Sequence, residues 1–331
     1  MNRAALKSNA RLYLSRKYGD ALGVAVVTSL IAGALSIFFS IVGNRFNPLT
    51  QLVFWDELAP LTGGAMDVER MTEQMIKSIE SVLSQLWLVG LILGVSLIVL
   101  PLYRILVGNV MTVGRDRWYL RAAYVEHTPP FGSLFSVFRK GDYTKITGAM
   151  LWRSFWLFLW SIPPYLILFL GLLPQQIVFY HLLINRAALT EGLILRISKQ
   201  YGLPLFLFSP LMLLVVLVLF LVFMIIRIRK SYQYRMLPYI LADNPQLGAR
   251  ASLKIAQDMT RGKIGRLFML DFSFIGWILL CLLCICLPWV TLHLFAPYYH
   301  MTWAEGYRVI RDEAAKQGIL RMEDLGYVRV G

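Results

Sequence analysis

Three cysteines in one short apolar stretch have the spacing that most resembles a set of metal ligands. Cys281, Cys284 and Cys286 form a C-x-x-C-x-C pattern, and thiolates at such spacing can bind a soft metal ion. A zinc or iron site normally needs four ligands, and the surrounding leucines and isoleucines favour the neutral thiol over the thiolate. Cysteine is also simply a small apolar residue in membrane helices. We therefore predict no metal site and no cofactor.

A carboxylate inside an apolar stretch is the second candidate for chemistry. Asp271 lies about one turn inside the run that begins at Leu267, where an ionised carboxylate must pair, contact water or bind a proton. It can carry protons or bind a cation. Alternatively it can cap backbone amides or pair with Arg104, Arg153 or Arg266 near the same face. We favour the structural role, and we keep Asp271, Arg104 and Arg153 as candidate functional residues.

Signatures of catalysis are absent from the rest of the sequence. It contains no G-x-x-x-x-G-K-[ST] phosphate loop, no H-E-x-x-H zinc motif and no G-x-S-x-G nucleophile elbow. The histidines are scattered, and none has a partner at the spacing of a helical zinc site: His127, His181, His293 and His300. We assign no catalytic residue and predict that the protein is not an enzyme.

The composition requires a solvent other than water for much of the chain. Of the 331 residues, 57% are hydrophobic and only 16% are charged, which is more apolar surface than one soluble core normally buries. The 33 lysines and arginines outnumber the 19 acidic residues, and they cluster beside apolar runs. In that position they act as topology signals rather than as a nucleic-acid surface. The sequence predicts a polytopic membrane protein that binds no nucleic acid.

Apolar runs of membrane-spanning length divide the chain. A helix that crosses the hydrocarbon core of about 30 Å needs about 20 apolar residues. Four runs meet this length, at 21–43, 86–107, 154–173 and 203–226. A fifth stretch has Pro288 near its middle, which favours a hairpin of two short spans at 267–284 and 287–306. We predict one all-α domain over 1–331, a transmembrane helical bundle of six spans, or of five if the last stretch is one tilted helix.

Basic residues are distributed unevenly among the connectors of these spans. The connectors 1–20, 108–150 and 227–266 hold five, six and nine lysines and arginines, whereas 44–82 and 174–202 hold three each. By the positive-inside rule the richer connectors are cytoplasmic, which places the amino terminus in the cytoplasm. Six spans return the carboxyl terminus to the cytoplasm, and five leave it outside.

Two connector segments have the pattern of helices that lie on a surface. In the basic helix predicted for 1–19, apolar residues recur every four positions beside a basic row, as an interfacial helix on anionic lipid requires. The stripe is Leu6, Ala10, Leu14 and Tyr18, and the row is Arg3, Lys7 and Arg11. Phe131, Leu134, Phe135 and Phe138 also have helical spacing, just before Arg139. Both stripes can face anionic lipid headgroups, or they can pack on the membrane helices.

A further helix is predicted at 245–262 on the cytoplasmic side. Asp243 or Asn244 can cap it, and Pro245 suits its first turn. Gly262 provides a stop ahead of the next span. This helix is the predicted contact for a membrane-protein partner.

Small residues and prolines indicate how the spans pack and bend. Small residues recur every four positions along the first span, and a G-x-x-x-G motif stands in the second, so close helix packing is expected. These residues are Ala21, Ala25, Ser29 and Gly33, then Gly90 and Gly94. The contact can be intramolecular or a seam between copies of the chain, and the intramolecular case is the default. Pro163, Pro164 and Pro210 are positions where the third and fourth spans can kink.

Several strings in the carboxyl-terminal third carry a family resemblance. They are PYILADNP from Pro238 to Pro245, MTRG from Met259 to Gly262, SFIGWILL from Ser273 to Leu280, and Pro297-Tyr298 followed by Thr302 and Ala304. Over about residues 225–307 the chain resembles a bacterial membrane-protein family known as domain of unknown function 975. The resemblance implies an integral protein of the bacterial plasma membrane with no established activity. The chain departs from the family at Cys284 to Cys286, where members often carry Gly-Ile-Gly, and by an insertion between Ile162 and Tyr232.

Two classes of function are compatible with these features. The lack of a catalytic constellation and the basic cytoplasmic segments favour a non-enzymatic membrane protein that scaffolds or regulates other components of the cell envelope. The alternative is a transporter or permease subunit, motivated by proline-containing spans, Asp271 and the helix 245–262. Since the chain has no ATP site, such a pump needs a separate energising partner. A lipid-modifying enzyme with dispersed catalytic residues is a third class.

Overall fold

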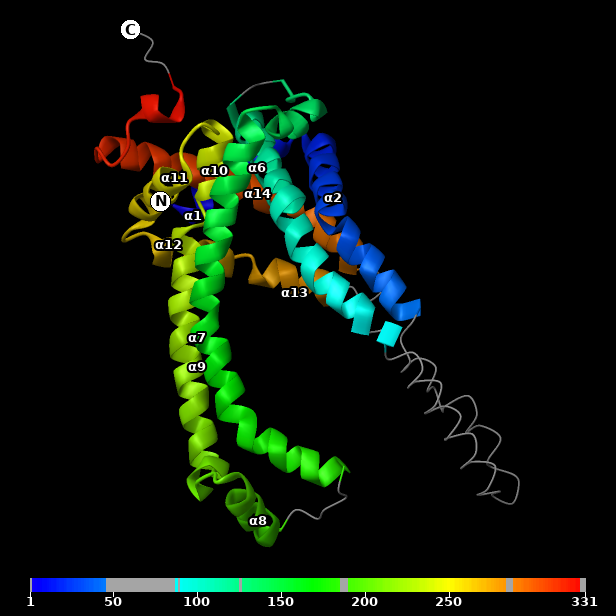
Figure 1. Cartoon of the computed structure of the whole chain (residues 1–331). Coiled ribbons are helices and arrows are strands. Elements are labelled where there is room, and N and C mark those ends of the chain that lie inside the picture. The colour runs from blue at the N-terminus through cyan, green and yellow to red at the C-terminus, as the bar shows by residue number, and fades with distance from the viewer. Residues whose placement is uncertain are drawn as a thin grey trace.

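The protein is built from helices (Figure 1). The computed structural model describes residues 2–45, 87–88, 90–124, 127–184, 190–283 and 288–327, and these ranges contain no β-strand, which confirms the predicted all-α fold. The α-helices are α1 (Arg3–Leu14), α2 (Tyr18–Arg45), α6 (Asn109–Tyr124), α7 (Asp142–Ile184), α8 (Glu191–Tyr201), α9 (Pro210–Gln233), α10 (Leu237–Asp243), α11 (Ala249–Thr260), α12 (Ile264–Phe272), α13 (Ile275–Leu283) and α14 (Pro288–Lys316). Shorter elements are the π-helical η2 (Arg104–Gly108) and the 3-10 helices η3 (Phe131–Phe138), η4 (Leu205–Phe208) and η5 (Met322–Leu325).

Five stretches of helix among the described residues are long and apolar enough to cross a membrane. They are Tyr18–Val42, Gly90–Tyr124, Asp142–Leu182, Pro210–Asp243 and Ile264–Leu283. In length and composition these helices are suited to a multi-pass membrane protein. Of the sixth predicted span, 287–306, residue 287 lies outside the described residues and the rest falls in α14. This helix is not one of the five, because histidines, prolines and Glu305 interrupt its apolar residues.

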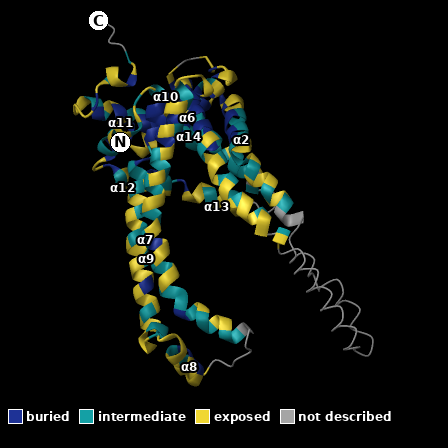
Figure 2. Cartoon of the chain, viewed as in Figure 1, coloured by how far each residue is buried: buried dark blue, intermediate teal, exposed yellow. Residues whose placement is uncertain are grey.

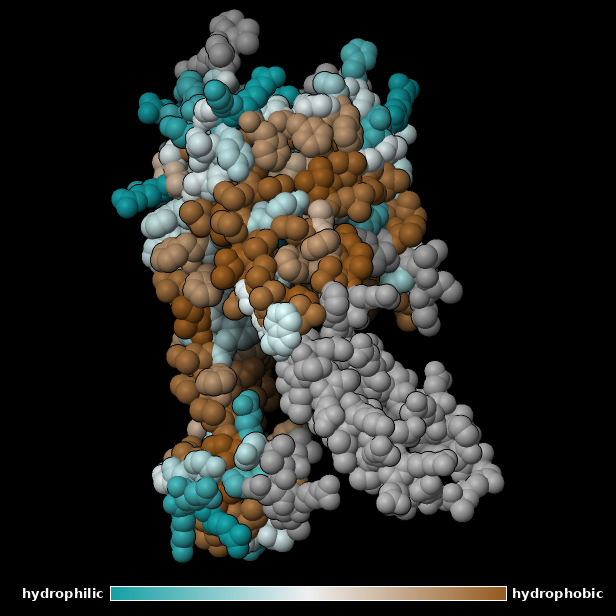
Figure 3. Space-filling model, turned by 45° about the vertical axis from the view of Figure 1, so that its right-hand side comes forward, coloured by the Kyte–Doolittle hydropathy of each residue, from teal (hydrophilic) through white to brown (hydrophobic). Residues whose placement is uncertain are grey.

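Two pairs of helices diverge from one packed end of the molecule (Figure 1). We call this end the head; it contains α1, α6, α10, α11 and the carboxyl-terminal half of α14. The helices α7 and α9 run side by side away from it, and α2 forms the second pair with the helix Gly90–Tyr124. Figure 2 shows that the buried residues gather in the head. Figure 3 shows a hydrophobic surface between hydrophilic ends, as a protein that crosses a bilayer requires.

The helix α14 joins the two ends of the chain within the head. The apolar stripe of α1 is buried against it: Leu6, Ala10 and Leu14 are at most 4% exposed. The side chain of Asn9 donates a hydrogen bond to Oε1 of Glu305 at 2.9 Å. Of the two environments considered for this stripe, packing on protein is therefore the one that the structure has.

The basic row of α1 contacts the carboxyl end of α12. Arg3 donates to the backbone carbonyl of Met269 at 3.4 Å, and Lys7 donates to that of Ser273 at 3.0 Å. The last carbonyls of a helix have no intrahelical partner and carry partial negative charge, so lysine and arginine stabilise them. Residues that read as lipid-binding in the sequence therefore also fasten α1 to the membrane helices.

The 3-10 helix η3 lies close against α6. Leu134 and Val137 are fully buried, whereas Phe131, Phe135 and Phe138 remain 37–43% exposed. The close approach depends on Gly114 of α6, because a Cβ atom there would lie 2.3 Å from the carbonyl oxygen of Leu134 and 3.2 Å from Val137. A side chain at position 114 would push η3 away.

The helix α9 begins several residues after the start of the uncharged run that predicts it. The run begins at Leu203, but α9 begins at Pro210, since the hydroxyl of Ser209 accepts a hydrogen bond from the amide of Met212. Proline in the first helical turn loses no hydrogen bond, so Pro210 starts the helix and does not kink it. Pro163 and Pro164 lie within α7, which stays helical through both.

The predicted cytoplasmic helix is α11, which is shorter than 245–262. Asn244 uses its side chain to accept a hydrogen bond from the amide of Gln246, so this region forms a turn, and α11 begins after Gly248. It ends just before Gly262, whose φ of +75° suits a residue without a side chain.

We predict that Gly114→Ala lowers the free energy of unfolding by about 1–3 kcal/mol, because the added methyl group overlaps the backbone of η3. The melting temperature of the purified protein in detergent measures the effect. The matched control is Gly148→Ala in α7, where an added methyl group meets no described atom within 4 Å and alanine favours the helix. Equal melting temperatures for the two variants would contradict the packing.

We also predict that both termini lie on the same side of the membrane, since α1 and α14 pack together. Green fluorescent protein, which fluoresces only in the cytoplasm, and alkaline phosphatase, which is active only outside it, are fused to each terminus in turn. Fluorescence from both termini and phosphatase activity from neither is expected. Reporters that place the two termini on opposite sides would rule out the contact between α1 and α14.

Candidate functional site

A small polar cavity lies in the head where several helices converge. Its volume is about 170 Å³. It is lined by Arg115 and Asp116 from α6, Arg153 from α7, Arg235 from the turn after α9, and His300 and Trp303 from α14. We call it the arginine cavity, because three of these side chains carry a guanidinium group.

The turn between α9 and α10 brings Arg235 into the interior. The helix α9 ends at Gln233, and α10 starts at Leu237 with Pro238 in its first turn. Because proline has no amide hydrogen to donate, it cannot extend α9 without loss of a hydrogen bond. The chain changes direction here, and the guanidinium group of Arg235 comes to lie 3.7 Å from the ring centroid of Trp303.

Arg235 forms an ion pair with Asp271 of α12. Its Nη1 donates to Oδ2 of Asp271 at 2.9 Å, and its Nη2 donates to the hydroxyl of Tyr299. The side chains are 29% and 20% exposed, so the pair is largely removed from solvent. Arg104, Arg153 and Arg266 were the partners considered from the sequence, and the structure supplies Arg235 instead.

Both oxygens of the Asp271 carboxylate accept further hydrogen bonds. The hydroxyl of Tyr232 donates to Oδ2 at 2.7 Å. The hydroxyl of Tyr299 and the indole of Trp303 donate to Oδ1 at 3.0 and 2.9 Å. With Arg235, these donors come from α9, the turn after it and α14, while the acceptor comes from α12. The arrangement is that of a carboxylate that clamps three segments together.

A second ion pair lies beside the cavity within α6. The Nε and Nη2 atoms of Arg115 both donate to Oδ1 of Asp116, at 3.0 and 2.8 Å. The side chain of Asp116 is 3% exposed. A buried carboxylate is costly unless it is paired and hydrogen-bonded, so Arg115 is committed to its neighbour.

Arg153 differs from the other two arginines of the cavity. Its Nε is buried and has no hydrogen-bond partner among the described residues, and within the same residues Arg153 forms no ion pair. Arg235, and more weakly Arg104 of η2, lie near enough to repel it electrostatically, whereas Asp116 attracts it. Of the three candidate residues named from the sequence, Arg153 lines the cavity, Asp271 pairs with a cavity arginine, and Arg104 adds positive charge nearby.

His300 adds an uncharged ring to the cavity wall. It lies on α14, outside the five candidate spans, and its ring centroid is 5.5 Å from that of Tyr119 and 5.6 Å from that of Tyr299. Burial, together with the charges of Arg115 and Arg235, holds the pKa of its imidazole well below the usual value. The ring is therefore neutral at physiological pH and adds no charge.

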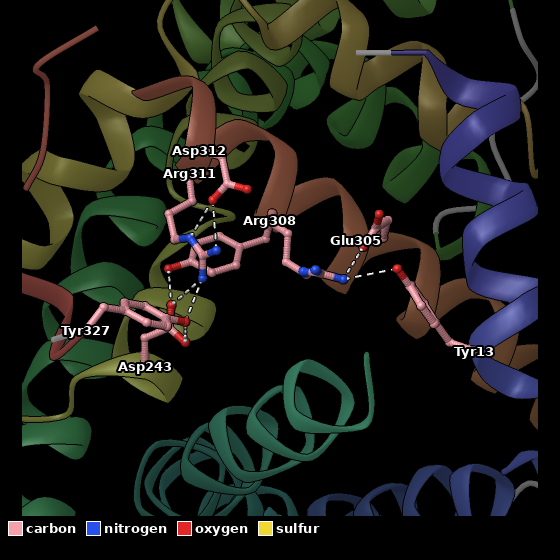
Figure 4. A network of polar contacts seen from close by, with 8 residues as sticks. Tyr13, Asp243, Glu305, Arg308, Arg311, Asp312 and Tyr327 are labelled. Carbon is pink, nitrogen blue, oxygen red and sulfur yellow. Dashed lines mark hydrogen bonds and ion pairs between the residues drawn. The ribbon is translucent and has the colours of Figure 1, made fainter. Parts of the chain in front are cut away.

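A second polar network holds the carboxyl-terminal tail against α10 and α14 (Figure 4). Tyr307 donates to Oδ2 of Asp243 at 2.8 Å, and Tyr327 donates to Oδ1 at 3.1 Å. Arg311 lies 3.6 Å from the same carboxylate and donates to the hydroxyl of Tyr327 at 2.6 Å. Burial and the charge of Asp243 raise the pKa of Tyr327, so this hydroxyl remains a donor.

The cysteine cluster is only partly described. Cys281 lies in α13 as a free thiol that donates to the carbonyl of Thr291 at 3.6 Å, whereas Cys284 and Cys286 lie outside the described residues. Within the part of the chain that the structure describes, no three His, Cys, Asp or Glu side chains are grouped so as to hold a metal ion.

Arg115, Asp116, Arg235, Tyr299 and Trp303 are members of the site that the sequence does not single out, and His300 stands out only as one of the scattered histidines. The available signal was the adjacent opposite charges of Arg115 and Asp116, which continue without a breaker from an apolar span. Arg235 gives no such signal, because it follows the basic end of the fourth span and counts as one more topology residue. Its inward direction depends on the turn that follows α9.

We predict that Asp271→Ala lowers the free energy of unfolding by about 3 kcal/mol, because it leaves the guanidinium group of Arg235 without its carboxylate. Melting in detergent measures the loss. Asp324→Ala is the matched control: Asp324 pairs with Arg321 at 3.6 Å, but the two side chains are 46% and 81% exposed, so the melting temperature should change little. A stable Asp271→Ala protein would show that the clamp is not needed.

Comparison with known proteins identifies the family but no characterised relative. The model of a family described as "Protein of unknown function (DUF975)" matches residues 1–314, well beyond the strings between 225 and 307 that carry the resemblance. No curated protein and no solved structure matches the chain. A match over nearly the whole length shows that the chain belongs to the DUF975 family of proteins of unknown function.

Proposed function

We propose that this protein is a non-enzymatic scaffold or accessory subunit for another membrane protein of the bacterial cell envelope. It resides in the plasma membrane with its amino terminus in the cytoplasm, as the distribution of basic connectors indicates. The head is its cytoplasmic end, and the pairs of helices that diverge from the head are its membrane part.

The observation that carries the proposal is the uncovered apolar surface of α9. Only Val216 of this helix is buried, where it packs against Gly171 of α7. An outward stripe at helical spacing is 50–69% exposed: Leu211, Leu214, Val218, Leu221 and Ile225. A helix that is apolar on every side suits a lipid environment, and its uncovered side can receive the helix of a partner.

A second open contact lies on the helix Gly90–Tyr124. A methyl group added at Gly90 or Gly94 would meet no described atom within 4 Å, so the G-x-x-x-G face packs on nothing within the described structure. Such a face allows the backbone of another helix to approach closely. Small residues packed inside the molecule lie elsewhere, at Gly114 and Gly171 and at Ala21 and Ala25 of the first predicted span, which are at most 2% exposed.

The arrangement of the membrane helices favours a scaffold over a permease. The pair α7 and α9 separates from the pair that contains α2 with distance from the head (Figure 1), so these described helices do not enclose a path across the membrane. The carboxylate of Asp271 is fully hydrogen-bonded rather than free to carry a cation. A scaffold needs neither a conduit nor a free carboxylate.

The helix α11 offers the cytoplasmic part of the contact. Leu253, Ala256 and Met259 are buried against the rest of the head, whereas Arg250 and Lys254 are exposed. A basic exposed face on an anchored helix can bind an acidic partner or anionic headgroups.

We predict that a photo-crosslinking amino acid at Leu214 or Leu221 forms an adduct with the same membrane protein in native membranes. Both positions lie on the outward stripe of α9, so both should capture the same partner. The control position is Leu195 of α8, which is 46% exposed but lies outside this stripe. Adducts with lipid alone at both α9 positions would refute the scaffold.

Affinity purification followed by mass spectrometry separates the scaffold from the permease subunit. Recovery of the crosslinked envelope protein in constant ratio supports the scaffold. Stoichiometric recovery of a nucleotide-hydrolysing ATPase would instead identify a permease subunit, since the chain itself lacks a phosphate-binding loop.

A further inference from the structure

We propose that the arginine cavity binds one phosphate-type oxyanion, with the guanidinium group of Arg153 as its principal ligand. This inference is independent of the scaffold function, because it concerns the interior of the head and not the uncovered face of α9. Three independent features of the cavity carry it: its charge, its unpartnered donor and its size.

The cavity has more positive than negative charge. Arg115 is paired with Asp116 and Arg235 with Asp271, so each carboxylate of the site is committed to one arginine. Arg153 is left without an ion pair among the described residues, and Arg104 lies near it. Asp116 attracts Arg153 but is paired with Arg115, so an anion placed beside Arg153 would balance a charge that no ion pair among the described residues neutralises.

The unpartnered donor lies at the cavity. Arg153 lines it, and its buried Nε makes no hydrogen bond to any described residue. Buried donors of folded proteins are nearly always satisfied, and each exception requires an explanation. The planar fork of an arginine matches the oxygens of a phosphate group, which can accept two of its hydrogens at once.

The size of the cavity suits a small anion. Its volume of about 170 Å³ is enough for a phosphate group, which has five non-hydrogen atoms. Because Ser231 at its edge is exposed, a larger molecule can place its phosphate end in the cavity while the rest stays outside.

The position of the mouth suggests two sources for the phosphate. Ser231 lines the cavity and is exposed, so the cavity opens near the end of α9. Lys230 precedes it, and Arg227 and Arg229 belong to the same basic cluster. Such clusters lie at the level of lipid headgroups, where the phosphate of a phospholipid and free phosphate from the cytoplasm are both within reach.

The test uses the full-length protein, purified and delipidated, in phosphate-free buffer. Inorganic phosphate is titrated at constant ionic strength and the melting temperature is recorded, and in parallel native mass spectrometry records retention of added phosphatidylglycerol. We expect the wild-type protein to bind one of the two probes saturably. We expect Arg153→Gln to weaken that binding by at least about tenfold, because a charge-assisted hydrogen bond is lost. Arg153→Lys should recover part of it.

Arg321→Gln is the matched control, because it removes the same charge from a side chain that is 81% exposed and lies outside the cavity, and it should bind as the wild type does. A melting temperature that rises only with inorganic phosphate identifies the free ion, and retention of the lipid alone identifies a headgroup. Binding of neither probe would overturn the proposal. Equal binding by Arg153→Gln would also overturn it. So would a melting temperature of Arg153→Gln below that of the wild type in delipidated, phosphate-free protein, because Arg153 would then have a partner within the protein.

Discussion

The ion pair between Arg235 and Asp271 is the contact on which the arrangement of the head depends. It joins the end of α9 to α12, and Tyr299 and Trp303 extend it to α14. Arg235 and Asp271 belong to different candidate spans, so the pair holds the α7 and α9 hairpin to the α12 to α14 region. Because the pair is largely removed from solvent, loss of either charge leaves the other uncompensated. Removing one partner therefore destabilises the protein more than the intact pair stabilises it.

The molecule has two parts that differ in how their side chains are satisfied. In the candidate spans the backbone bonds within the helices, so an apolar helix such as α9 can leave most of its side chains uncovered by the described chain. In the head, buried charges must be paired, and networks around Asp271, Asp116 and Asp243 pair them. Among the three arginines of the cavity, Arg153 is the one without an ion pair to a described residue, and it lies where the networks leave a cavity. A binding site at that point follows from the same rule that orders the rest of the head.

The sequence predicts the helices of this fold far better than their contacts. Uncharged runs locate the spans because burial in lipid selects for composition, which a single sequence displays. The ends of the helices are harder to predict from the sequence. The cap by Ser209 places the start of α9 at Pro210, seven residues after the uncharged run begins. The environment of the α1 stripe was left open because lipid and the face of α14 select the same apolar residues at Leu6, Ala10 and Leu14.

Only those residues of the site whose charge is unusual for their place in the sequence can be predicted from it. Asp271 stands out as a carboxylate in an apolar stretch, but its partner Arg235 is one of nine basic residues in its connector, and only the turn before α10 directs it inward. A double-mutant cycle with Arg235→Met and Asp271→Leu, read as the free energy of unfolding in detergent, tests the clamp most directly. The account predicts that the double variant loses less stability than the two single variants together, by at least about 1 kcal/mol. Additive losses would contradict it.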